Sequence, residues 1–576
     1  MLYLFFPTII SCIYCLCDDL NKKILPKSVN PINNSFILIF ILSLIYVFES
    51  FINLIPIKSF FLLVIISLIF LIYFFLNIKK IFIKKIFFLK KLYNHKLIFY
   101  LILCYFILIL FPAFDEDTLR YHLPIAKLIN EKKFFDFYWF DHLTIGTQEF
   151  LNSFFLKFNF EFGSSFLNFL FIIYLILSLN YLNEKFFKKT INPNNILILL
   201  SAPYFMSLML SQKLYLIACY ISVISITYVF LKKNKILYQE LILISFSGVF
   251  MFITKAIFFP YIILFFFLIL FYIDIKKAIS LYFLNFLILV LFYFPIAYFK
   301  LQFFGDPLLP MIQLNETNYS WFPGYKYYLT EMQMDYTQKF DNLFIKFILT
   351  PIKLILPLTP SDVLKCFGAS FLLILTINYK NRKIIFLTLF MFINIFVLLN
   401  TQTRWFLPLL VFLTIFANTN KFILFKILLI MQSIVVLITL IPLSFATLLG
   451  NIKIINNDEI INKFQGSNKV ILDVNKITKD KKVITDFNFW YNLNNFYPVY
   501  YPFLSTVQNK NIYISNRKND DYILWDSKYT DIKSFVKNSL KCKEYQLVES
   551  YVFNNTRLFF INKKSTVNLY QISQCG

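Results

Sequence analysis

Residues 111–150 read FPAFDEDTLRYHLPIAKLINEKKFFDFYWFDHLTIGTQEF, the longest stretch in the first half of the chain that a lipid bilayer cannot accept. Three consecutive acids, Asp115, Glu116 and Asp117, follow directly on an apolar run. The stretch also contains two of the chain's three histidines. Because most of the surrounding sequence consists of apolar runs with short lysine-rich links, we expect any chemistry of the chain in this segment.

The composition indicates a polytopic membrane protein. Of 576 residues, 59% are hydrophobic and 20% are aromatic. Many apolar runs exceed the roughly 18 residues that mark a candidate transmembrane helix. The formal charge of 56 − 31 = +25 does not indicate nucleic-acid binding, because the lysines cluster in short links between apolar runs, as they do in cytoplasmic loops. We therefore expect membrane lipids, and no nucleic acid, as partners.

Apolar runs and basic links together predict about fourteen transmembrane helices with the N-terminus outside. Basic links, among them a segment at 77–96 with paired lysines, alternate with links that hold at most one basic residue, such as Lys213 or Arg404. The basic links are expected on the cytoplasmic surface. The predicted spans lie near residues 1–17, 35–57, 58–76, 97–113, 164–181, 195–209, 214–231, 239–253, 256–273, 279–298, 361–378, 384–400, 405–418 and 422–446.

This alternation places two long loops and the C-terminus outside. The loops cover 114–163 and 299–360, and within the second loop three prolines and Lys353 mark 345–360 as interfacial or re-entrant. From residue 447 the composition becomes polar with short β-like stretches, which predicts a small extracytoplasmic α/β domain. The chain thus divides into N-terminal helices with a basic segment (1–96), a transmembrane core (97–446) and the outer domain (447–576).

The polar C-terminal region contains candidate strands, a candidate helix and a candidate disulfide. Cys542 and Cys575 are the two cysteines in a polar region, where a disulfide is conceivable. A helix is expected near 529–540, and strands are expected at KVILDV (469–474), KKVITDF (481–487), NIYIS (511–515), DYILW (521–525) and LFFIN (558–562).

The acidic cluster offers a candidate general base. Its three carboxylates repel one another unless a cation lies among them. The spacing of four places Asp117 and Tyr121 on one helical face, with Asp117 either as the N-cap or as a base that faces the membrane surface. Asp115 lies off that face if the helix begins at Asp117. Acids that merely flank the outer end of a span are the structural alternative.

His122 has three possible roles. It could bind a divalent metal together with Asp115 or Asp117, contact a substrate, or be a hydrogen-bonded polar residue without a chemical role. The pattern requires no cofactor, and a divalent metal is a candidate only. Further along, the aromatic run at 134–140 beside Asp141-His142 predicts an interfacial helix on the lipid headgroups.

Two later motifs lie at the predicted outer surface. FGDPLLP at 304–310 follows a span, and its glycine and prolines predict a rigid turn. QTRWFLP at 402–408 places Arg404 at the outer end of a span. An arginine so near hydrocarbon either extends toward the interface or binds an anion. A phosphate would suit its guanidinium, and so would the acids of the first outer loop.

Together these motifs resemble the integral-membrane glycosyltransferases of the GT-C class, which includes protein O-mannosyltransferases, lipid A aminoarabinose transferases and uncharacterised bacterial relatives. The resemblance rests on DEDTLRYHLPIAK at 115–127, FGDPLLP, QTRWFLP and the outer C-terminal domain. Members often have Asp-x-x-x-Tyr, sometimes followed by His-Leu-Pro, in the first outer loop, as at 117–124. Here three additional spans precede the motif, and Asp115 and Asp117 are rival bases.

The resemblance implies an acid of this loop as the base and a polyprenyl-phosphate sugar as the donor. We therefore predict a bacterial inner (plasma) membrane enzyme that transfers a sugar to a glycan, lipid or protein acceptor on the extracytoplasmic face. A polysaccharide polymerase or ligase, or a non-enzymatic flippase or transporter of a lipid-linked saccharide, is the alternative. Asp117 and Asp115 are the candidate catalytic residues, and the candidate substrate-binding residues are Glu116, Arg120, Tyr121, His122 and Arg404.

Overall fold

The fold is taken from a computed structural model of the 576-residue chain. Single described residues lie between 258 and 270 and at 307 and 454. The described ranges are 2–26, 28–54, 95–113, 118–131, 145–188, 191–211, 213–232, 235–254, 273–304, 343–357, 365–377, 382–398, 403–419, 422–452, 466–479, 481–485, 496–498, 521–526, 532–534, 536–537, 540–557 and 561–575.

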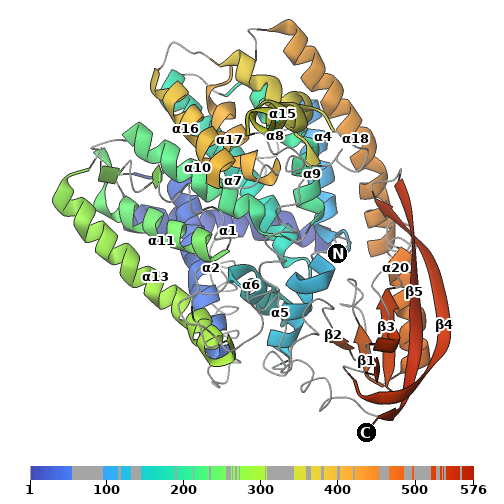
Figure 1. The fold of residues 1–576 in the computed structure, drawn as a ribbon. Helices are drawn as coiled ribbons and strands as arrows, with labels where there is room; N and C mark the ends of the chain where they lie inside the picture. Colours follow the sequence, from blue (N-terminus) through green and yellow to red (C-terminus); the bar gives the residue numbers. More distant parts are fainter. Residues whose placement is uncertain are drawn as a thin grey trace.

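The N-terminal three quarters of the chain form a bundle of apolar helices, which confirms the class of helical membrane protein (Figure 1). Within the described residues, 5 helices are long and apolar enough to cross a membrane, or 6 if one bent pair counts as a span. The number of about fourteen spans therefore stays a prediction. The 5 helices are α2 (Pro31–Leu54), α7 (Gly163–Phe187), α10 (Tyr215–Lys232), α13 (Ile275–Phe304) and α18 (Ile423–Asn451).

Other helices complete the bundle. Helix α1 (Leu2–Ile24) covers the first predicted span and contacts α2. Short helices lie between the long ones and pack against them, because an isolated short helix is unstable and must bury an apolar face. They are α4 (Lys96–Ile107), η1 (Leu108–Leu110), η2 (Thr118–His122), α5 (Leu123–Asn130), α6 (Thr147–Leu156), α11 (Tyr238–Thr254), α16 (Arg382–Leu398) and α17 (Thr403–Phe416).

The predicted span at 195–209 is not one continuous helix: the segment is two helices that form either a bent span or a re-entrant loop. Helices α8 (Pro193–Leu200) and α9 (Pro203–Leu210) meet at an angle of 60°. Pro203 begins α9 and holds the preceding Ala202 in an extended conformation, which a continuous helix does not allow. The amide of Gln432 on α18 donates to the carbonyl of Ser201 at 2.9 Å. A side chain of a neighbouring helix thus satisfies a backbone group that the break releases.

In the predicted span at 361–378, the described residues do not form the expected α-helix. Residues Gly368–Thr376 form a 3-10 helix, η9, rather than an α-helix. Gly368 has φ +65°, a left-handed conformation, and Gln432 accepts a hydrogen bond from the next amide, that of Ala369, at 2.6 Å. The proline-containing segment before it forms α15 (Leu343–Ile355), a helix of 13 residues that packs on η9.

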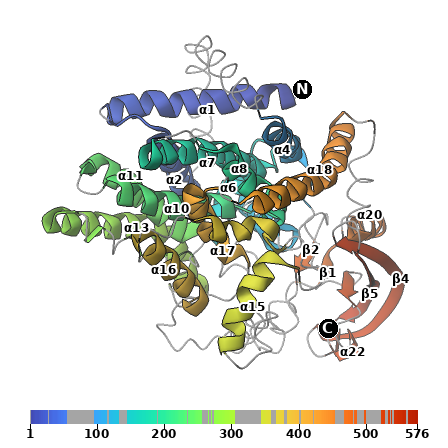
Figure 2. The same cartoon turned by 90° about the horizontal axis from the view of Figure 1, so that it is seen from above.

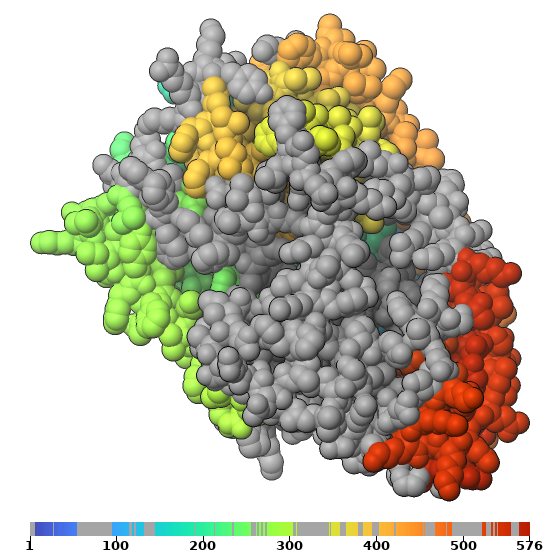
Figure 3. All heavy atoms as spheres, in the orientation of Figure 1, coloured from blue at the N-terminus to red at the C-terminus, as the bar shows by residue number. Residues whose placement is uncertain are grey.

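Two long helices present apolar side chains at the surface. Helices α13 and α18 lie on opposite sides of the bundle (Figures 1 and 2), and the side chains of α13 line one edge of the molecule in Figure 3. In a folded protein a continuous apolar stripe of this kind faces lipid or another apolar surface. The stripe on α13 consists of Ile279, Phe283, Phe286, Val290, Phe294, Tyr298 and Leu301, which are 45–64% exposed.

One group of interhelical links is joined by polar and aromatic contacts. The buried Glu240 accepts hydrogen bonds from Tyr228 at 2.6 Å, Asn33 at 3.0 Å and Lys232 at 3.1 Å, and also from Ser28. These residues come from the α1–α2 link, the start of α2, the end of α10 and the start of α11. They are all at the end of the bundle that the lysine distribution assigns to the cytoplasm.

Further contacts extend this group. The ring of Phe186, at the end of α7, packs on Phe230 and Phe416. Nearby, the Asn192 side chain donates to Thr419 at 2.9 Å. The described residues that flank three of the predicted cytoplasmic links therefore lie together, at 186–192, 230–232 and 416–419. Which face of the membrane they occupy stays a prediction.

The C-terminal region folds around a mixed sheet of 5 strands in the order β2-β1-β3-β5-β4. Strand β1 (Val483–Thr485) pairs in parallel with β2 (Phe496–Pro498) and β3 (Tyr522–Asp526). A long antiparallel hairpin of β4 (Cys542–Arg557) and β5 (Ile561–Cys575) completes the sheet. Helix α20 (Gly466–Thr478) contacts β4 (Figure 2). A disulfide joins Cys542 to Cys575 at the open end of the hairpin. The predicted small α/β fold and the disulfide are both present.

Two details of the C-terminal prediction are wrong. The segment 469–474, expected as a strand, lies inside α20, where its apolar residues face the sheet as one side of an amphipathic helix. Strand β4 was not predicted, because its sequence alternates polar and apolar residues only weakly. The strands expected at 481–487 and 521–525 correspond to β1 and β3, and the helix near 529–540 to the short α22 (Ile532–Ser534). Residues 511–515 and 558–560 lie outside the described residues.

The sidedness of the bundle can be measured with single cysteines. We expect Gln546→Cys on β4 to react with a membrane-impermeant maleimide in intact cells, and Lys276→Cys at the start of α13 to react only after permeabilisation. Gln546 and Lys276 are both exposed, so burial in the protein does not shield either position from the reagent. Lys188→Cys is a second cytoplasmic control. Reaction of Gln546→Cys and Lys276→Cys on the same side would contradict the predicted topology.

Candidate functional site

The structure describes only part of the acidic motif. Asp115, Glu116 and Asp117 lie outside the described residues, as does the aromatic segment 134–142. Arg120 and Tyr121 belong to the turn of π-helix η2, but their side chains are not among those described. A π-turn is rare and is found often at functional sites. The first described residue after the acids is Thr118, which is fully buried, so the acids directly precede a buried turn.

His122 is held by an acid that the motif itself does not contain. Its Nδ1 atom lies 2.5 Å from Oε1 of Glu149 on α6, and the two side chains are 1% and 3% exposed. An ionised carboxylate only accepts hydrogen bonds, so Nδ1–H donates to Glu149. The structure thus joins the end of the acidic motif to the first turn of α6. His122 was predicted to contact substrate, but its described contact is with Glu149.

The sequence Gly146-Thr147-Gln148-Glu149 explains how α6 begins. Glu149 stands at the third helical position, and its Oε2 accepts the backbone N–H of Gly146 at 2.8 Å. An acid there satisfies a free N–H and complements the helix dipole. A Cβ atom on Gly146 would lie 2.5 Å from the backbone oxygen of Ile253 on α11. Glycine therefore allows the close approach of α6 and α11 that fixes Glu149 in place.

The residue beside Glu149 reaches the start of α10. Oε1 of Gln148 accepts the backbone N–H of Leu214 at 3.2 Å. Asn168 on α7 donates to the carbonyl of Lys213 at 2.7 Å. Both bonds are buried. The short link before α10 is therefore held on two sides, by α6 and by α7.

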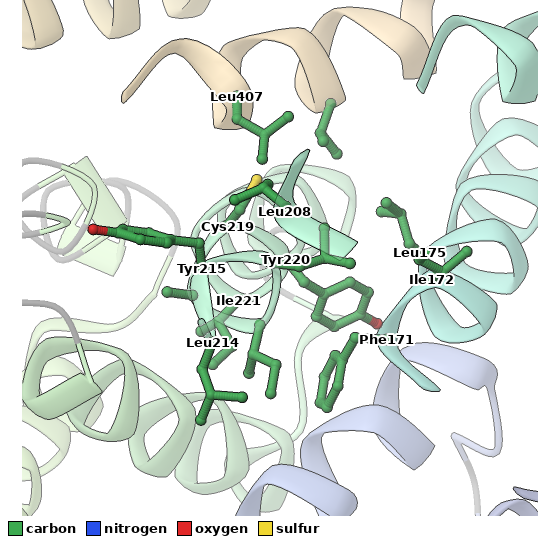
Figure 4. Close-up of a cluster of buried hydrophobic side chains, with 14 of the residues drawn as sticks. Phe171, Ile172, Leu175, Leu208, Leu214, Tyr215, Cys219, Tyr220, Ile221 and Leu407 are labelled. Carbon is green, nitrogen blue, oxygen red and sulfur yellow. The ribbon is translucent and has the colours of Figure 1, made fainter. Parts of the chain in front are cut away.

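Arg404 lies against the start of α10. Its Nη1 atom donates to the hydroxyl of Tyr215 at 3.2 Å, and its guanidinium lies 4.5 Å from the centre of the Trp405 ring. The contact with an aromatic ring and the hydrogen bond hold the guanidinium in place. Figure 4 shows that the hydroxyl of Tyr215 points away from the apolar cluster around Leu214 and Tyr220. The predicted anion-binding arginine and the acidic loop are thus linked through α6 and α10.

Buried cations distinguish this end of the bundle. Lys213, Lys300 and Lys353 are 8%, 3% and 7% exposed, and sequence places all three on the outer side. In contrast, Lys188 and Lys276, which the topology assigns to the cytoplasm, are exposed. A buried ammonium is stable only beside anionic or strongly polar partners. The three buried lysines therefore have polar or electrostatic partners within the protein.

A metal site is not formed by the described residues: no group of three His, Cys, Asp or Glu side chains among them could hold an ion. The acids that would complete a site with His122 lie outside the described residues. A divalent metal at Asp115, Asp117 and His122 therefore stays an untested alternative.

Sequence reasoning missed Gln148, Glu149 and Tyr215. Glu149 could have been found, because an acid three residues after a glycine that precedes an apolar run is a helix-start signal. Gln148 and Tyr215 carry no local signal, since their roles depend on partners 66 and 189 residues away along the chain.

Comparison with protein-family models, with curated proteins and with solved structures finds no match to this chain.

We expect Gly146→Ala to destabilise the bundle by about 1–3 kcal/mol, because its Cβ forces α6 away from the backbone of α11. Gly248 on α11 is the matched control, since nothing lies within 4 Å of a Cβ there. Gly248→Ala should be neutral or stabilise by about 0.5–1 kcal/mol. Thermal unfolding of the detergent-solubilised variants measures both. Equal stability of the two variants would contradict the close approach.

Proposed function

We propose that this protein is a membrane glycosyltransferase that moves a sugar from a polyprenyl-phosphate-linked donor to an acceptor on the extracytoplasmic face. The observation that supports it is the connection of the acidic first outer loop to Arg404, through the contacts of His122 with Glu149 and of Gln148 with Leu214. A transfer site needs a proton acceptor and an anion-binding cation near each other.

The donor's chemistry fits the bundle. A polyprenyl chain is dissolved in the bilayer, and the surface of the bundle offers the apolar stripes of α13 and α18 to lipid. When the sugar leaves, its carrier keeps a phosphate whose charge grows in the transition state. Arg404, already held by Tyr215 and Trp405, would stabilise that charge without a large reorganisation.

The remaining roles come from the acidic motif. Asp117 or Asp115 takes the proton of the acceptor hydroxyl as its oxygen attacks the anomeric carbon and the bond from that carbon to the phosphate oxygen breaks. Glu116, Arg120 and Tyr121 contact the sugar or the acceptor. The enzyme works in the bacterial inner membrane with its acceptor outside. A glycan, a lipid or a protein could supply the acceptor hydroxyl.

Sugar transfer from a panel of undecaprenyl-phosphate hexoses, measured in proteoliposomes, tests whether Asp117 or Asp115 is the base. Asp117→Asn should lower sugar transfer by about 100- to 10,000-fold with normal expression, because an amide cannot accept the proton. Full activity in Asp117→Asn together with loss in Asp115→Asn would move the role to Asp115. Wild-type activity in both variants would contradict a carboxylate base. Translocation of the donor without transfer would identify a flippase instead.

Arg404 is tested in the same assay. Arg404→Gln should lower kcat/KM by about 30- to 1,000-fold, equivalent to about 2–4 kcal/mol, because both donor binding and leaving-group stabilisation lose a charge. Arg404→Lys keeps the charge but loses the stacking on Trp405 and the fork geometry, so we expect a smaller loss. Unchanged kcat and KM in both variants would exclude Arg404 from the site.

A further inference from the structure

The first turn of α6 contacts two parts of the candidate site with two consecutive residues. Gln148 accepts the backbone N–H of Leu214, and Glu149 holds His122. Consecutive residues of a helix point about 100° apart, so the two side chains reach different neighbours. We call these four residues the α6 clamp.

One side of the clamp fixes η2, the helical turn that follows the acids in the sequence. His122 is the last residue of η2, and Thr118, its first residue, follows directly on Asp117. The turn between them is buried at both ends, since Thr118 and His122 are 0% and 1% exposed. The contact of His122 with Glu149 therefore fixes the position of η2, whose first residue, Thr118, follows Asp117 in the sequence.

The other side fixes the start of α10, and through it the cation. Leu214 immediately precedes Tyr215, whose hydroxyl accepts a hydrogen bond from Arg404. Helix α6 itself is anchored at both ends: Gly146 lies against α11, and Lys157 forms an ion pair with Glu49 on α2 at 2.5 Å. The clamp is thus part of a fixed frame.

We propose that Gln148 and Glu149 are positioning residues, and that the α6 clamp sets the position of η2 relative to Arg404. This inference rests on the proposed function. The acids directly precede η2 in the sequence, so if they hold the acceptor hydroxyl and Arg404 holds the donor phosphate, the clamp influences how the two reactants meet. A misplacement of about 1 Å can lower the rate of such a reaction by about 100-fold.

Kinetics separate the two sides of the clamp. In Glu149→Gln the amide oxygen can still accept the N–H of Gly146, but the amide NH2 cannot accept the Nδ1–H of His122, so the histidine must change tautomer or lose the contact. We expect kcat to fall about 10- to 100-fold with donor KM within about twofold. Gln148→Met removes the acceptor for Leu214, and donor KM should rise about 10-fold. Gln148→Glu keeps an acceptor oxygen and should restore donor KM.

The control is Gly248→Ala on α11, where nothing lies within 4 Å of an added Cβ, and it should leave kcat and KM near wild type. Parallel changes of kcat and KM in Glu149→Gln and Gln148→Met, or equal changes in Gly248→Ala, would overturn the clamp and leave a structural role.

Hydrogen exchange in nanodiscs tests the clamp without catalysis. Glu149→Gln should accelerate exchange of the amides at 118–122, and Gln148→Met that of the amide of Leu214, each without effect on the other segment. Unchanged exchange in both variants, or faster exchange throughout the bundle, would contradict the proposal. If wild type transfers no sugar, the proposed function fails, while this measurement still decides whether the clamp exists.

Discussion

The structure depends on one constraint: inside an apolar bundle each polar group must find its partner within the protein. Glu240 shows this at one end, where four side-chain donors from three segments surround a single carboxylate. Gln432 shows it in the middle, where one amide bonds both the broken helix pair α8–α9 and η9. Each such contact joins segments far apart in sequence. The bundle is therefore ordered by a few polar contacts as well as by its continuous apolar packing.

The same constraint gives the two ends of the bundle different properties. At the end assigned to the cytoplasm the described lysines are mostly exposed, and Glu240 has its partners within the protein. At the other end Lys213 is buried, and the Arg404 guanidinium lies near the rings of Tyr215 and Trp405. Positive charge near hydrocarbon favours a ligand that is itself both anionic and lipid-soluble. A phosphate on a polyprenyl chain has both properties, and a soluble sugar nucleotide has only one.

Composition and hydropathy were enough to predict the membrane class, and they indicated the small C-terminal sheet region and a possible disulfide there, because each depends on local residue types. The break at Ser201 was not predicted, although Pro203 marks it locally. The 3-10 helix η9 was not predicted, since it is held by Gln432, which lies 63 residues beyond Ala369. Segment 469–474 has strand-like residues, but packing on β4 makes it a helix. In the site, Arg404 carried a recognisable pattern, while Gln148 and Tyr215 acquire their roles from distant partners. Asp115 and Asp117 remain sequence predictions.

The central claim is that the outer end of the bundle binds a polyprenyl phosphate. A cryo-EM structure of the full chain in nanodiscs with undecaprenyl phosphate tests it most directly. We expect the phosphate within hydrogen-bond distance of the Arg404 guanidinium, with the prenyl chain leaving the site along the apolar surface of the bundle. A phosphate bound at the opposite end, beside Glu240 and Lys232, or no bound lipid phosphate at saturating concentration, would contradict the account.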